Sequence, residues 1–380
     1  MEYARQLQLT DFIGKKSCFL FGPRQTGKST LLRTQLPQAP TWNLLNASVY
    51  RALAADPSLL RHELLALPSK PKCIVIDEVQ RIPELLNEVH LMIEEHGFRF
   101  VLTGSSARAL RRRGVNLLAG RARTLCLHPF TSRELGKDFD LLKALNYGLL
   151  PPIYLSDTPE TDLDDYVGTY LREEIAAEGL ARNIPAFSRF LEIAALCNGQ
   201  QINFTKMASD AQVKRTTIVD WFDVLRDTLI AHELPAWRES RKRKAVATSK
   251  YFLFDIGVAR HQAHTGPLHP RSKPFGDAFG HFIFHELVCS RSYGLYQSVH
   301  YWRSTSQFEV DFILDEAIAI EVKSTASIDK DDLKGLRALQ EEARMRRYIV
   351  VALVDRPQRI GEIEVLPYSE FLESLWNKTL

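Results

Sequence analysis

The sequence has no long hydrophobic run and no marked excess of either charge. Apolar stretches such as Cys73 to Ile76 fall far short of the ~20 residues that a membrane-spanning helix needs. The 49 Lys and Arg nearly balance the 46 Asp and Glu, so the net charge of +3 gives no argument for nucleic-acid binding by itself. We therefore expect no membrane-spanning segment, and any contact with nucleic acid has to come from a local basic patch.

Cysteine is also scarce. The five cysteines lie more than 50 residues apart, a spacing that favours neither a disulfide framework nor a Cys-x-x-Cys zinc site. Residues 1–10 lack the basic start, apolar centre and small-residue cleavage site of a secretory signal. We therefore expect buried free thiols in a cytoplasmic protein, whose 380 residues suffice for about two to three domains.

A glycine-rich loop follows the first short apolar stretch, Ser17 to Phe21, which we predict to be a buried strand. The loop matches G-x-x-x-x-G-K-[ST] at every fixed position and leads into a predicted helix. Gly22 and Gly27 allow successive backbone N–H groups to turn toward a phosphate. Lys28 would contact the β and γ phosphates of ATP, and Ser29 would offer its hydroxyl to Mg²⁺. The predicted ATP-binding residues are Gly22, Pro23, Arg24, Gln25, Thr26, Gly27, Lys28, Ser29 and Thr30.

An acidic pair ends the next predicted strand. Asp77 and Glu78 directly follow the apolar residues Cys73 to Ile76. A carboxylate in this place holds Mg²⁺ through its water shell, and a second one beside it polarises the attacking water as a general base. We predict the first role for Asp77 and the second for Glu78. The alternative is a buried strand with a solvated acidic end.

A third predicted strand, residues 98–102, leads into polar and then basic sequence. Thr103 or Ser105, just after this strand, is placed to sense the γ-phosphate, although polar residues also end strands without any function. Between Arg99 and Thr124 there is no acid but there are seven arginines: Arg99, Arg108, Arg111, Arg112, Arg113, Arg121 and Arg123. Such a patch suits phosphate, either of a nucleotide or of a nucleic acid.

Together these segments resemble the prokaryotic AAA-type ATPases that carry a conserved carboxy-terminal domain of unknown function. The resemblance covers the whole chain and rests on the loop at Gly22, on Ile76-Asp77-Glu78-Val79-Gln80, on Leu102-Thr103-Gly104-Ser105-Ser106 and on Leu118-Ala119-Gly120-Arg121. It implies an α/β fold with an AAA-type P-loop NTPase core at residues 1–135, built on a parallel sheet. It also implies that Asp77 and Glu78 are the Walker B pair and that Ser105 lies near the sensor position.

The same resemblance implies an arginine that reaches the γ-phosphate of a neighbouring subunit. Arg121 is the best-placed candidate, with Arg108 and Arg112 behind it; the alternative is a solvated arginine. An arginine supplied by a neighbour can raise the rate by roughly 10³ or more. We therefore expect a homo-oligomer.

Helical periodicity replaces the strand pattern after residue 135. We predict a helical lid at residues 136–185 and a winged helix-turn-helix domain at residues 186–266. The three helices of the second domain are predicted at residues 187–197, 204–211 and 215–229.

The wing of this domain is predicted at residues 230–251. It has one acid, Glu239, between residues 238 and 250, against six basic residues: Arg238, Arg241, Lys242, Arg243, Lys244 and Lys250. Lys206, Lys214 and Arg215 on the helices could also meet phosphate. The pattern predicts DNA as a partner, and the alternative is a protein-contact module with a solvated basic hairpin.

The last part of the chain, residues 267–380, returns to alternating helices and strands. We predict a helix at residues 275–288 and strands at 299–303, 308–314 and 317–323, with a further helix and strand after them. Glu321 and Lys323 share one face of their strand. Asp311 and Glu321 could then share a divalent metal while Lys323 holds or activates the water that attacks a phosphodiester.

These residues resemble the core signature of the PD-(D/E)XK, restriction-endonuclease-like fold. Many nucleases of that fold also place a glutamate on the first helix, where this sequence has Gly280; Glu286 is the nearest substitute, about two helical turns away. The leading interpretation is Mg²⁺-dependent ATP hydrolysis coupled, through the winged helix, to a nuclease-like domain that binds or cuts DNA. The alternative is an ATP-switched DNA-binding or protein-remodelling regulator whose nuclease-like domain is inactive.

Overall fold

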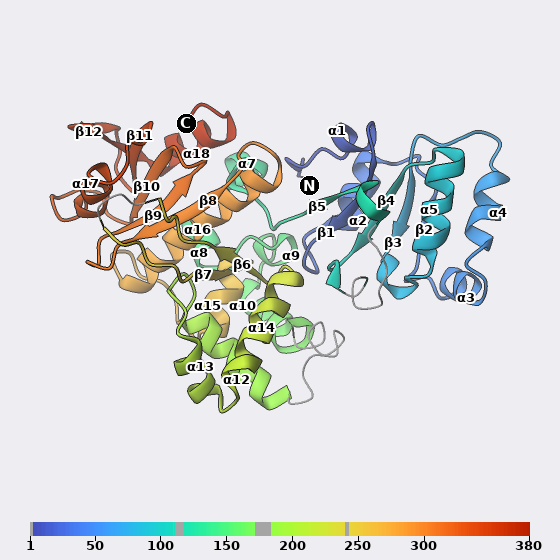
Figure 1. Cartoon of the computed structure of the whole chain (residues 1–380), viewed down its shortest axis with the longest axis horizontal. Helices are drawn as coiled ribbons and strands as arrows, with labels where there is room; N and C mark the ends of the chain where they lie inside the picture. Colours follow the sequence, from blue (N-terminus) through green and yellow to red (C-terminus); the bar gives the residue numbers. More distant parts are fainter. Residues whose placement is uncertain (1–2, 109, 111–117, 172–183, 240–242) are drawn as a thin grey trace. The chain divides into compact units, whose positions relative to one another are not determined.

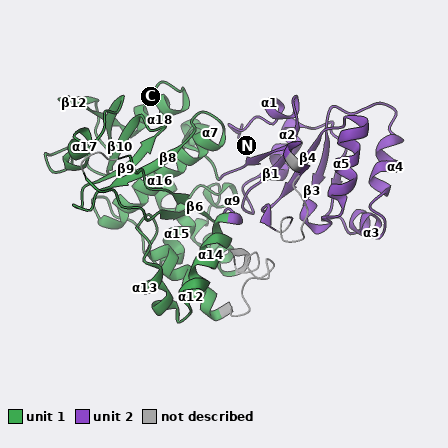
Figure 2. Ribbon diagram, in the orientation of Figure 1, with its two compact units in different colours: residues 1, 129–226, 230–380 green, residues 2–128, 227–229 purple. Residues whose placement is uncertain are grey.

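The computed structural model describes residues 3–108, 110, 118–171, 184–239 and 243–380. The chain forms two compact units, drawn in different colours in Figure 2. We call residues 2–128 with 227–229 the N-terminal unit, and residues 129–226 with 230–380 the C-terminal unit. Among the described residues, no helix is both long enough and apolar enough to cross a membrane.

The N-terminal unit is built on a five-stranded parallel sheet with the strand order β2-β3-β4-β1-β5 (Figure 1). The strands are β1 (Ser17–Phe21), β2 (Thr41–Asn43), β3 (Ile74–Asp77), β4 (Phe100–Gly104) and β5 (Ala122–Cys126). The three central strands are buried along their whole length, as expected of a parallel sheet covered on both faces. The predicted strand Ser17–Phe21 is confirmed with the same bounds.

Helices connect these strands because a parallel pair needs a crossover. They are α2 (Lys28–Gln35), α3 (Ala47–Ala55), α4 (Leu59–Leu65) and α5 (Leu85–His96), with 3-10 turns at Val79–Arg81 and Leu118–Gly120, whereas α1 (Thr10–Ile13) precedes β1. Val89 and Met92 of α5 are fully buried and belong to one core with Phe19, Phe21 and Leu102 of the sheet. This core fixes the carboxyl ends of β1, β3 and β4, where the predicted site residues lie.

The first half of the C-terminal unit is helical. Its elements are α7 (Ser132–Leu135), a 3-10 turn (Gly136–Asp138), α8 (Leu141–Tyr147), α9 (Pro151–Tyr154), α10 (Pro159–Asp165), a π-helical segment (Tyr166–Leu171), α12 (Ile184–Leu196), α13 (Phe204–Ala211), α14 (Arg215–Asp227) and α15 (Ile256–Gln262). The helix predicted at residues 204–211 is confirmed. Phe190, Trp221 and Phe222 pack with ring centroids 5.1 Å apart and hold α12 against α14.

The second half of this unit contains a six-stranded mixed sheet in the order β12-β13-β11-β10-β9-β8. Its elements are α16 (Lys273–Ser292), β8 (Val299–Arg303), β9 (Glu309–Leu314), β10 (Ile318–Lys323), α17 (Lys334–Gln340), β11 (Arg347–Ala352), β12 (Gln358–Ile360), β13 (Ile363–Pro367) and α18 (Tyr368–Trp376). β8, β9 and β10 are antiparallel, whereas β10, β11 and β13 are parallel. The predicted order of a helix, three strands, a helix and a strand is confirmed.

The segment predicted to be a wing, residues 230–251, contains β6 (Ala231–Leu234) and the start of β7 (Lys250–Leu253), which pair as antiparallel strands. Described residues between these two strands lie along the edge strand β8. The Trp237 N–H donates to the Tyr301 carbonyl (2.7 Å), and the Val246 N–H donates to the Arg303 carbonyl (2.8 Å). The described part of the hairpin is therefore attached to the C-terminal sheet by backbone hydrogen bonds.

The buried Asp255 links the start of α15 to the segment that follows α8. Its carboxylate is fully buried, accepts the N–H of Leu149 (2.7 Å) and caps α15 through the N–H of Val258 (3.0 Å). Gly148 has φ +80°, and a Cβ there would lie 2.0 Å from the Asp255 carboxylate. Burial raises the pKa of Asp255 to about 6. The sequence around Asp255 therefore has a structural role.

A second buried carboxylate fastens the start of the C-terminal unit to α16. Glu286 accepts the Ser132 N–H and the Trp376 indole N–H, both at 2.7 Å. Its neighbour His285 donates to the Phe130 carbonyl (2.8 Å). We call Glu286 and His285 with these contacts the α16 clasp. Burial raises the pKa of Glu286 to about 7, and the negative charge of Glu134 adds to the shift.

The α16 clasp predicts a pH dependence of stability. Between the ordinary pKa of 4.5 and about 7, the folded chain holds the Glu286 proton more tightly than the unfolded chain does, so stability is lost as the pH rises. In Glu286→Gln this loss is absent, and the melting temperature of the variant relative to wild type should rise from pH 5 to pH 8. Glu373→Gln, at an exposed position of α18, should show no such trend. Parallel profiles for Glu286→Gln and wild type would contradict the prediction.

Candidate functional site

The glycine-rich loop joins the end of β1 to the start of α2. Gly27 has φ +93° and Gln25 has φ +65°, and left-handed residues of this kind are typical of loops whose N–H groups converge on an anion. A Cβ on Gly22 would lie 2.3 Å from the Leu127 carbonyl oxygen, so only glycine fits there. Because α2 begins at Lys28, the positive end of its dipole adjoins the loop.

Lys28 lies within the loop and is buried. Its ammonium donates to the carbonyl oxygens of Gly22 (2.6 Å) and Pro23 (3.0 Å). The Thr26 hydroxyl also donates to the Pro23 carbonyl (2.9 Å), and Thr26 is fully buried. The positive charge predicted to contact phosphate is therefore held inside the loop that would bind it.

Ser29 and Asp77 meet where β3 ends. The Ser29 hydroxyl lies 3.5 Å from the Oδ2 of Asp77, and the Thr103 hydroxyl donates to the Oδ1 of the same carboxylate. Asp77 is 5% exposed. A hydroxyl and a carboxylate at this separation are the oxygen ligands that Mg²⁺ takes beside bound phosphates, so the residues present fit this ion.

Glu78 is held by two neighbours. Its N–H donates to the Thr103 hydroxyl oxygen (3.1 Å), and the Gln80 amide donates to its Oε2 (2.5 Å). Thr103 therefore contacts both members of the acidic pair, and Gln80 orients the carboxylate predicted to act as a base. The sequence pattern did not single out Gln80, because its approach to Glu78 depends on the 3-10 turn that follows β3.

Ser105, the other candidate sensor, takes part through its backbone. Its carbonyl oxygen accepts the N–H of Gly22 at 3.4 Å and so links the end of β4 to the loop. Thr103 is fully buried and bonded to Asp77, whereas Ser105 is half-buried. Of these two residues, Thr103 makes the more direct side-chain contact with the acidic pair.

Two of the candidate finger arginines, Arg121 and Arg108, have partners within the chain. The Arg121 guanidinium donates to the Glu94 carboxylate, and this contact lowers the pKa of Glu94. Arg108 pairs with Asp227 at 2.8 Å, within the same unit. Arg112 lies outside the described residues.

A cavity of about 590 Å³ adjoins the Ser29 and Asp77 pair. β2 and β3 run in parallel with Asn43 opposite Asp77, and both residues line this cavity. Thr41 and Arg33 also line it. Sequence reasoning missed Asn43, because only the sheet order places the end of β2 beside β3.

A second cluster lies in the C-terminal unit on β9 and β10. The Asp311 carboxylate accepts the N–H of Val322 (2.8 Å), and the Lys323 ammonium lies 2.9 Å from the Oε1 of Glu321. Glu321 is 8% exposed, and its Oε2 has no hydrogen-bond partner among the described residues. The predicted residues Asp311, Glu321 and Lys323 thus lie on adjacent strands, with one carboxylate oxygen buried and unpaired.

The charges of this cluster are coupled. Burial raises the pKa of Glu321 to about 8, and the nearby Asp311 carboxylate adds to the shift. Burial also raises the pKa of Asp311. For Lys323, burial alone would lower the pKa, but the Glu321 carboxylate raises it above its ordinary value. No group of three or more His, Cys, Asp or Glu suited to a metal occurs in the described part of the chain.

Lys250 is a further residue of this cluster. Its ammonium is ion-paired with Glu309, lies 4.8 Å from the centre of the Tyr301 ring and lowers the pKa of Asp311 against the dominant effect of burial. Lys250 is 7% exposed. The prediction that it contacts DNA from a wing rested on its basic neighbours in sequence, whereas in the fold it is turned toward β9.

Glu286 does not supply the missing glutamate of the first helix. Both of its oxygens are occupied in the α16 clasp, by Ser132 and Trp376. Gly280, where the resemblance places that glutamate, has no atom within 4 Å of the position of a Cβ. One turn earlier on α16, a Cβ on Gly276 would lie 3.1 Å from the hydroxyl of Ser324, which follows β10.

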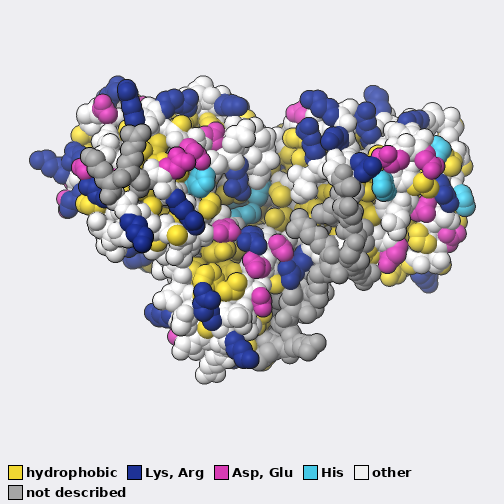
Figure 3. Space-filling model, viewed as in Figure 1, with side chains coloured by type: hydrophobic (Ala, Val, Ile, Leu, Met, Phe, Trp, Pro, Cys, Tyr) yellow, Lys and Arg dark blue, Asp and Glu magenta, His cyan; other side chains and the backbone are white. Residues whose placement is uncertain are grey.

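The basic residues predicted to contact DNA differ in their surroundings. Arg243 pairs with Glu342 (2.8 Å) and Glu341 (2.6 Å), whereas Lys206, Lys214 and Arg215 are exposed around α13 and the start of α14. On the face drawn in Figure 3, Lys and Arg side chains are scattered over each unit and form no single continuous surface. Arg241 and Lys242 lie outside the described residues.

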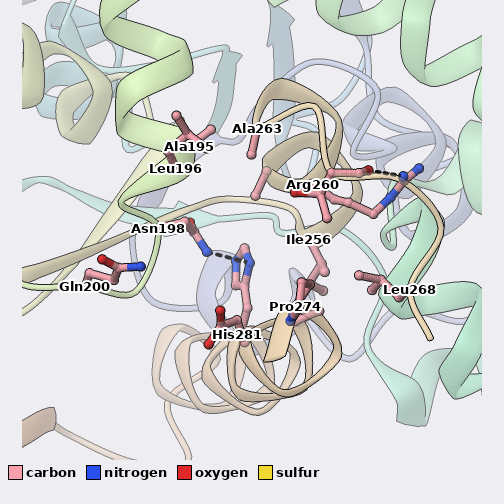
Figure 4. Close-up of a pocket in the computed structure, with 14 residues that line it drawn as sticks. Ala195, Leu196, Asn198, Gln200, Ile256, Arg260, Ala263, Leu268, Pro274 and His281 are labelled. Atoms are coloured by element: carbon pink, nitrogen blue, oxygen red, sulfur yellow. Dashed lines mark hydrogen bonds between the residues drawn. The ribbon is translucent and has the colours of Figure 1, made fainter. Parts of the chain in front are cut away.

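A smaller pocket of about 140 Å³ lies among the helices of the C-terminal unit (Figure 4). His281 bonds Asn198 (3.2 Å) and the Leu253 carbonyl (2.8 Å), and burial lowers its pKa to about 3. Arg260 donates to the carbonyls of Asn146 and Thr265 and to Glu160. Since His281 and Arg260 both have hydrogen-bond partners within the protein, we interpret the pocket as part of the packing.

Three family profiles match consecutive parts of the chain. Residues 14–136 match an AAA domain, residues 138–268 a domain of unknown function (DUF8612), and residues 275–371 a domain of unknown function (DUF4143). With the loop geometry, these matches support an AAA-type P-loop ATPase. The two later matches assign no activity to residues 138–371.

Two relatives, each named only as an uncharacterized protein, match this chain along most of their own length. A Mycobacterium tuberculosis protein is 26% identical over 335 residues, covering 84% of this chain and 74% of its own. A Haemophilus influenzae protein is 25% identical over 349 residues, covering 83% and 84%. The crystal structure of a STAND (Signal Transduction ATPase with Numerous Domains) protein from Pyrococcus horikoshii, which has a tetratricopeptide repeat sensor, covers 77% of this chain and 48% of its own at 11% identity. Its TM-score of 0.22 is too low to support an argument.

The contacts of Thr103 predict a role in turnover. Thr103→Val keeps the shape of the side chain but removes the hydroxyl that bonds Asp77 and the Glu78 N–H. Loss of such a supporting contact typically costs about 10–100-fold in activity, so we expect kcat for ATP hydrolysis to fall by that factor while KM changes less. Thr124→Val, at an exposed position of β5, is the control. Equal kcat values for Thr103→Val and wild type would contradict the prediction.

Proposed function

We propose that the chain is a Mg²⁺-dependent ATPase whose nucleotide cycle is coupled to DNA binding, and that its C-terminal unit cleaves DNA. The observation that carries the ATPase part is the convergence of Lys28, Ser29 and Asp77 at the carboxyl ends of β1 and β3. Ligands of α/β sheets bind at this edge. The AAA match over residues 14–136 supports the same conclusion.

In this proposal the residues of the loop have separate tasks. Mg²⁺, held by Ser29 and Asp77, would neutralise charge on the β and γ phosphates. Lys28 moves from the loop carbonyls to the phosphates, Glu78 orients and deprotonates the attacking water, and Thr103 fixes Asp77 relative to Glu78. Arg121 exchanges Glu94 for the γ-phosphate of a neighbouring subunit, which is why a homo-oligomer is part of the proposal.

Support for the DNA part comes from the C-terminal unit. Its order of a helix, three antiparallel strands, a helix and a parallel strand agrees with the resemblance to a PD-(D/E)XK nuclease. Asp311 and Glu321 offer two carboxylates for a divalent metal, and Lys323 lies beside them as the candidate to hold the attacking water. The exposed Lys206, Lys214 and Arg215 are the candidates for contact with DNA phosphates.

A second candidate function is a regulator whose nuclease-like domain is inactive. Two observations favour it. The position of the helix glutamate is Gly280, with Glu286 occupied elsewhere, and Lys250 brings a second ammonium charge near Asp311, one of the two carboxylates that would hold a metal. In this function ATP binding switches DNA or protein binding, and no phosphodiester is cleaved.

Two substitutions separate the proposed activities. Lys28→Ala should abolish ATP turnover and leave metal-dependent cleavage of DNA, whereas Asp311→Ala should abolish cleavage and leave ATP turnover. The measurement is phosphate release together with Mg²⁺- or Mn²⁺-dependent cleavage of linear, branched and single-stranded DNA, with and without ATP. Lys15→Ala and Asp355→Ala, at exposed positions of the same units, are the matched controls. Turnover that survives Lys28→Ala would contradict the ATPase proposal.

The second candidate function predicts a gain of activity. Gly280→Glu adds a carboxylate to α16 where a Cβ meets no neighbouring atom, so we expect the variant to fold. If the missing glutamate is what prevents cleavage, the variant should cleave DNA with Mn²⁺ where wild type does not, and adding Asp311→Ala should remove the new activity. Gly280→Gln, which cannot act as an anionic ligand, is the control. Wild-type chain that already cleaves DNA would exclude this function.

A further inference from the structure

The buried Arg5 contacts the phosphate-binding loop from outside. Its guanidinium donates to the carbonyl oxygens of Thr26 (2.7 Å) and His128 (2.6 Å), and Arg5 is 8% exposed. The same group lies 3.4 Å from the place that a Cβ on Gly27 would take. Neither a motif nor a charge pattern singles out this arginine in the sequence.

The Thr26 carbonyl explains why the loop needs such a donor. When successive N–H groups of a loop turn toward an anion, the carbonyls of the same peptides turn to the other side. Lys28 takes the carbonyls of Gly22 and Pro23, and Arg5 takes that of Thr26. Thr26 is fully buried, so water cannot easily replace the guanidinium, and a buried carbonyl left without a donor is costly.

The second contact ties the loop to the sheet. His128 follows β5, and the preceding Leu127 donates its N–H to Phe21 at the end of β1 (2.8 Å). Arg5 therefore connects the phosphate-binding loop to the segment that follows β5 and lies beside the end of β1. Its own segment is anchored on α2, because Gln35 accepts the Leu9 N–H (2.7 Å) and donates to the Leu7 carbonyl (2.9 Å).

We infer that Arg5 is a positioning residue of the nucleotide site, which holds the Thr26 and Gly27 peptides in the conformation that binds phosphate. The inference rests on the proposed ATP binding. Arg5 holds the loop in its binding conformation before the nucleotide binds, and its fixed positive charge beside Gly27 strengthens binding of the polyphosphate. Its removal therefore weakens binding of ATP more than it weakens the fold.

The test compares Arg5→Met with wild type in binding of a fluorescent ATP analogue and in KM and kcat for ATP. Leaving buried carbonyls without a donor should raise Kd and KM about tenfold or more. Arg5→Lys keeps the charge but reaches one carbonyl, so its KM should lie between the two. Arg260→Met is the matched control, since Arg260 is also buried and also donates to two backbone carbonyls, those of Asn146 and Thr265, in the C-terminal unit.

Each outcome decides the inference. Unchanged Kd and KM in Arg5→Met, with wild type binding ATP, would overturn it while leaving the ATPase proposal intact. Wild type that binds no ATP would overturn both. Gln35→Leu releases the segment from α2 and leaves the Arg5 contacts, so an equal rise in KM in that variant would overturn a specific role for Arg5. If Arg5→Met does not fold, Arg5→Lys decides: a KM equal to that of wild type overturns the inference.

Discussion

A loop that turns its backbone N–H groups toward an anion turns the carbonyl oxygens of the same peptides away from it. In the N-terminal unit, residues from several elements donate hydrogen bonds to these carbonyls or hold the loop in place. Lys28 takes two of them from within the loop and Arg5 takes a third from the start of the chain. The ends of β4 and β5 then hold the loop through the Ser105 carbonyl and the segment at Leu127. The parallel sheet is needed for the site because it brings the carboxyl ends of its strands to one edge, and the bonded pair Asp77 and Thr103 lies at the same edge.

The sequence was informative wherever a function depends on residues close together in the chain. The strand at Ser17–Phe21, the glycine-rich loop and the pairing of Ser29 with the acid at the end of β3 follow from local pattern and from the order of a P-loop core. Arg5, Asn43 and Gln80 could not be found in that way. Their contacts depend on the order of strands in the sheet or on the docking of a terminal segment, and these are settled by tertiary packing.

In the C-terminal unit, too, local sequence patterns were informative, whereas composition did not predict which residues the charged side chains contact. Alternation along β10 puts Glu321 and Lys323 on one face, because side-chain period two is a local property of strands, and the pairing of β9 with β10 brings Asp311 beside them. The basic run after Arg238 was interpreted from composition alone. In the structure, Arg243 is paired with acids of the segment after α17 and Lys250 with Glu309, so composition did not reveal where these charges point.

The docking of residues 235–239 and 243–250 on β8 also determines how the chain can be divided. The profile matches would place a border between residues 268 and 275, but the hairpin that covers the edge of the C-terminal sheet belongs to the part before that border. A fragment that starts at residue 275 would leave β8 with unpaired backbone groups, and such an edge is open to association with another strand. It would also lack Trp237, which is buried in the core of that sheet. The folding unit here is therefore longer than the segment recognised by sequence similarity.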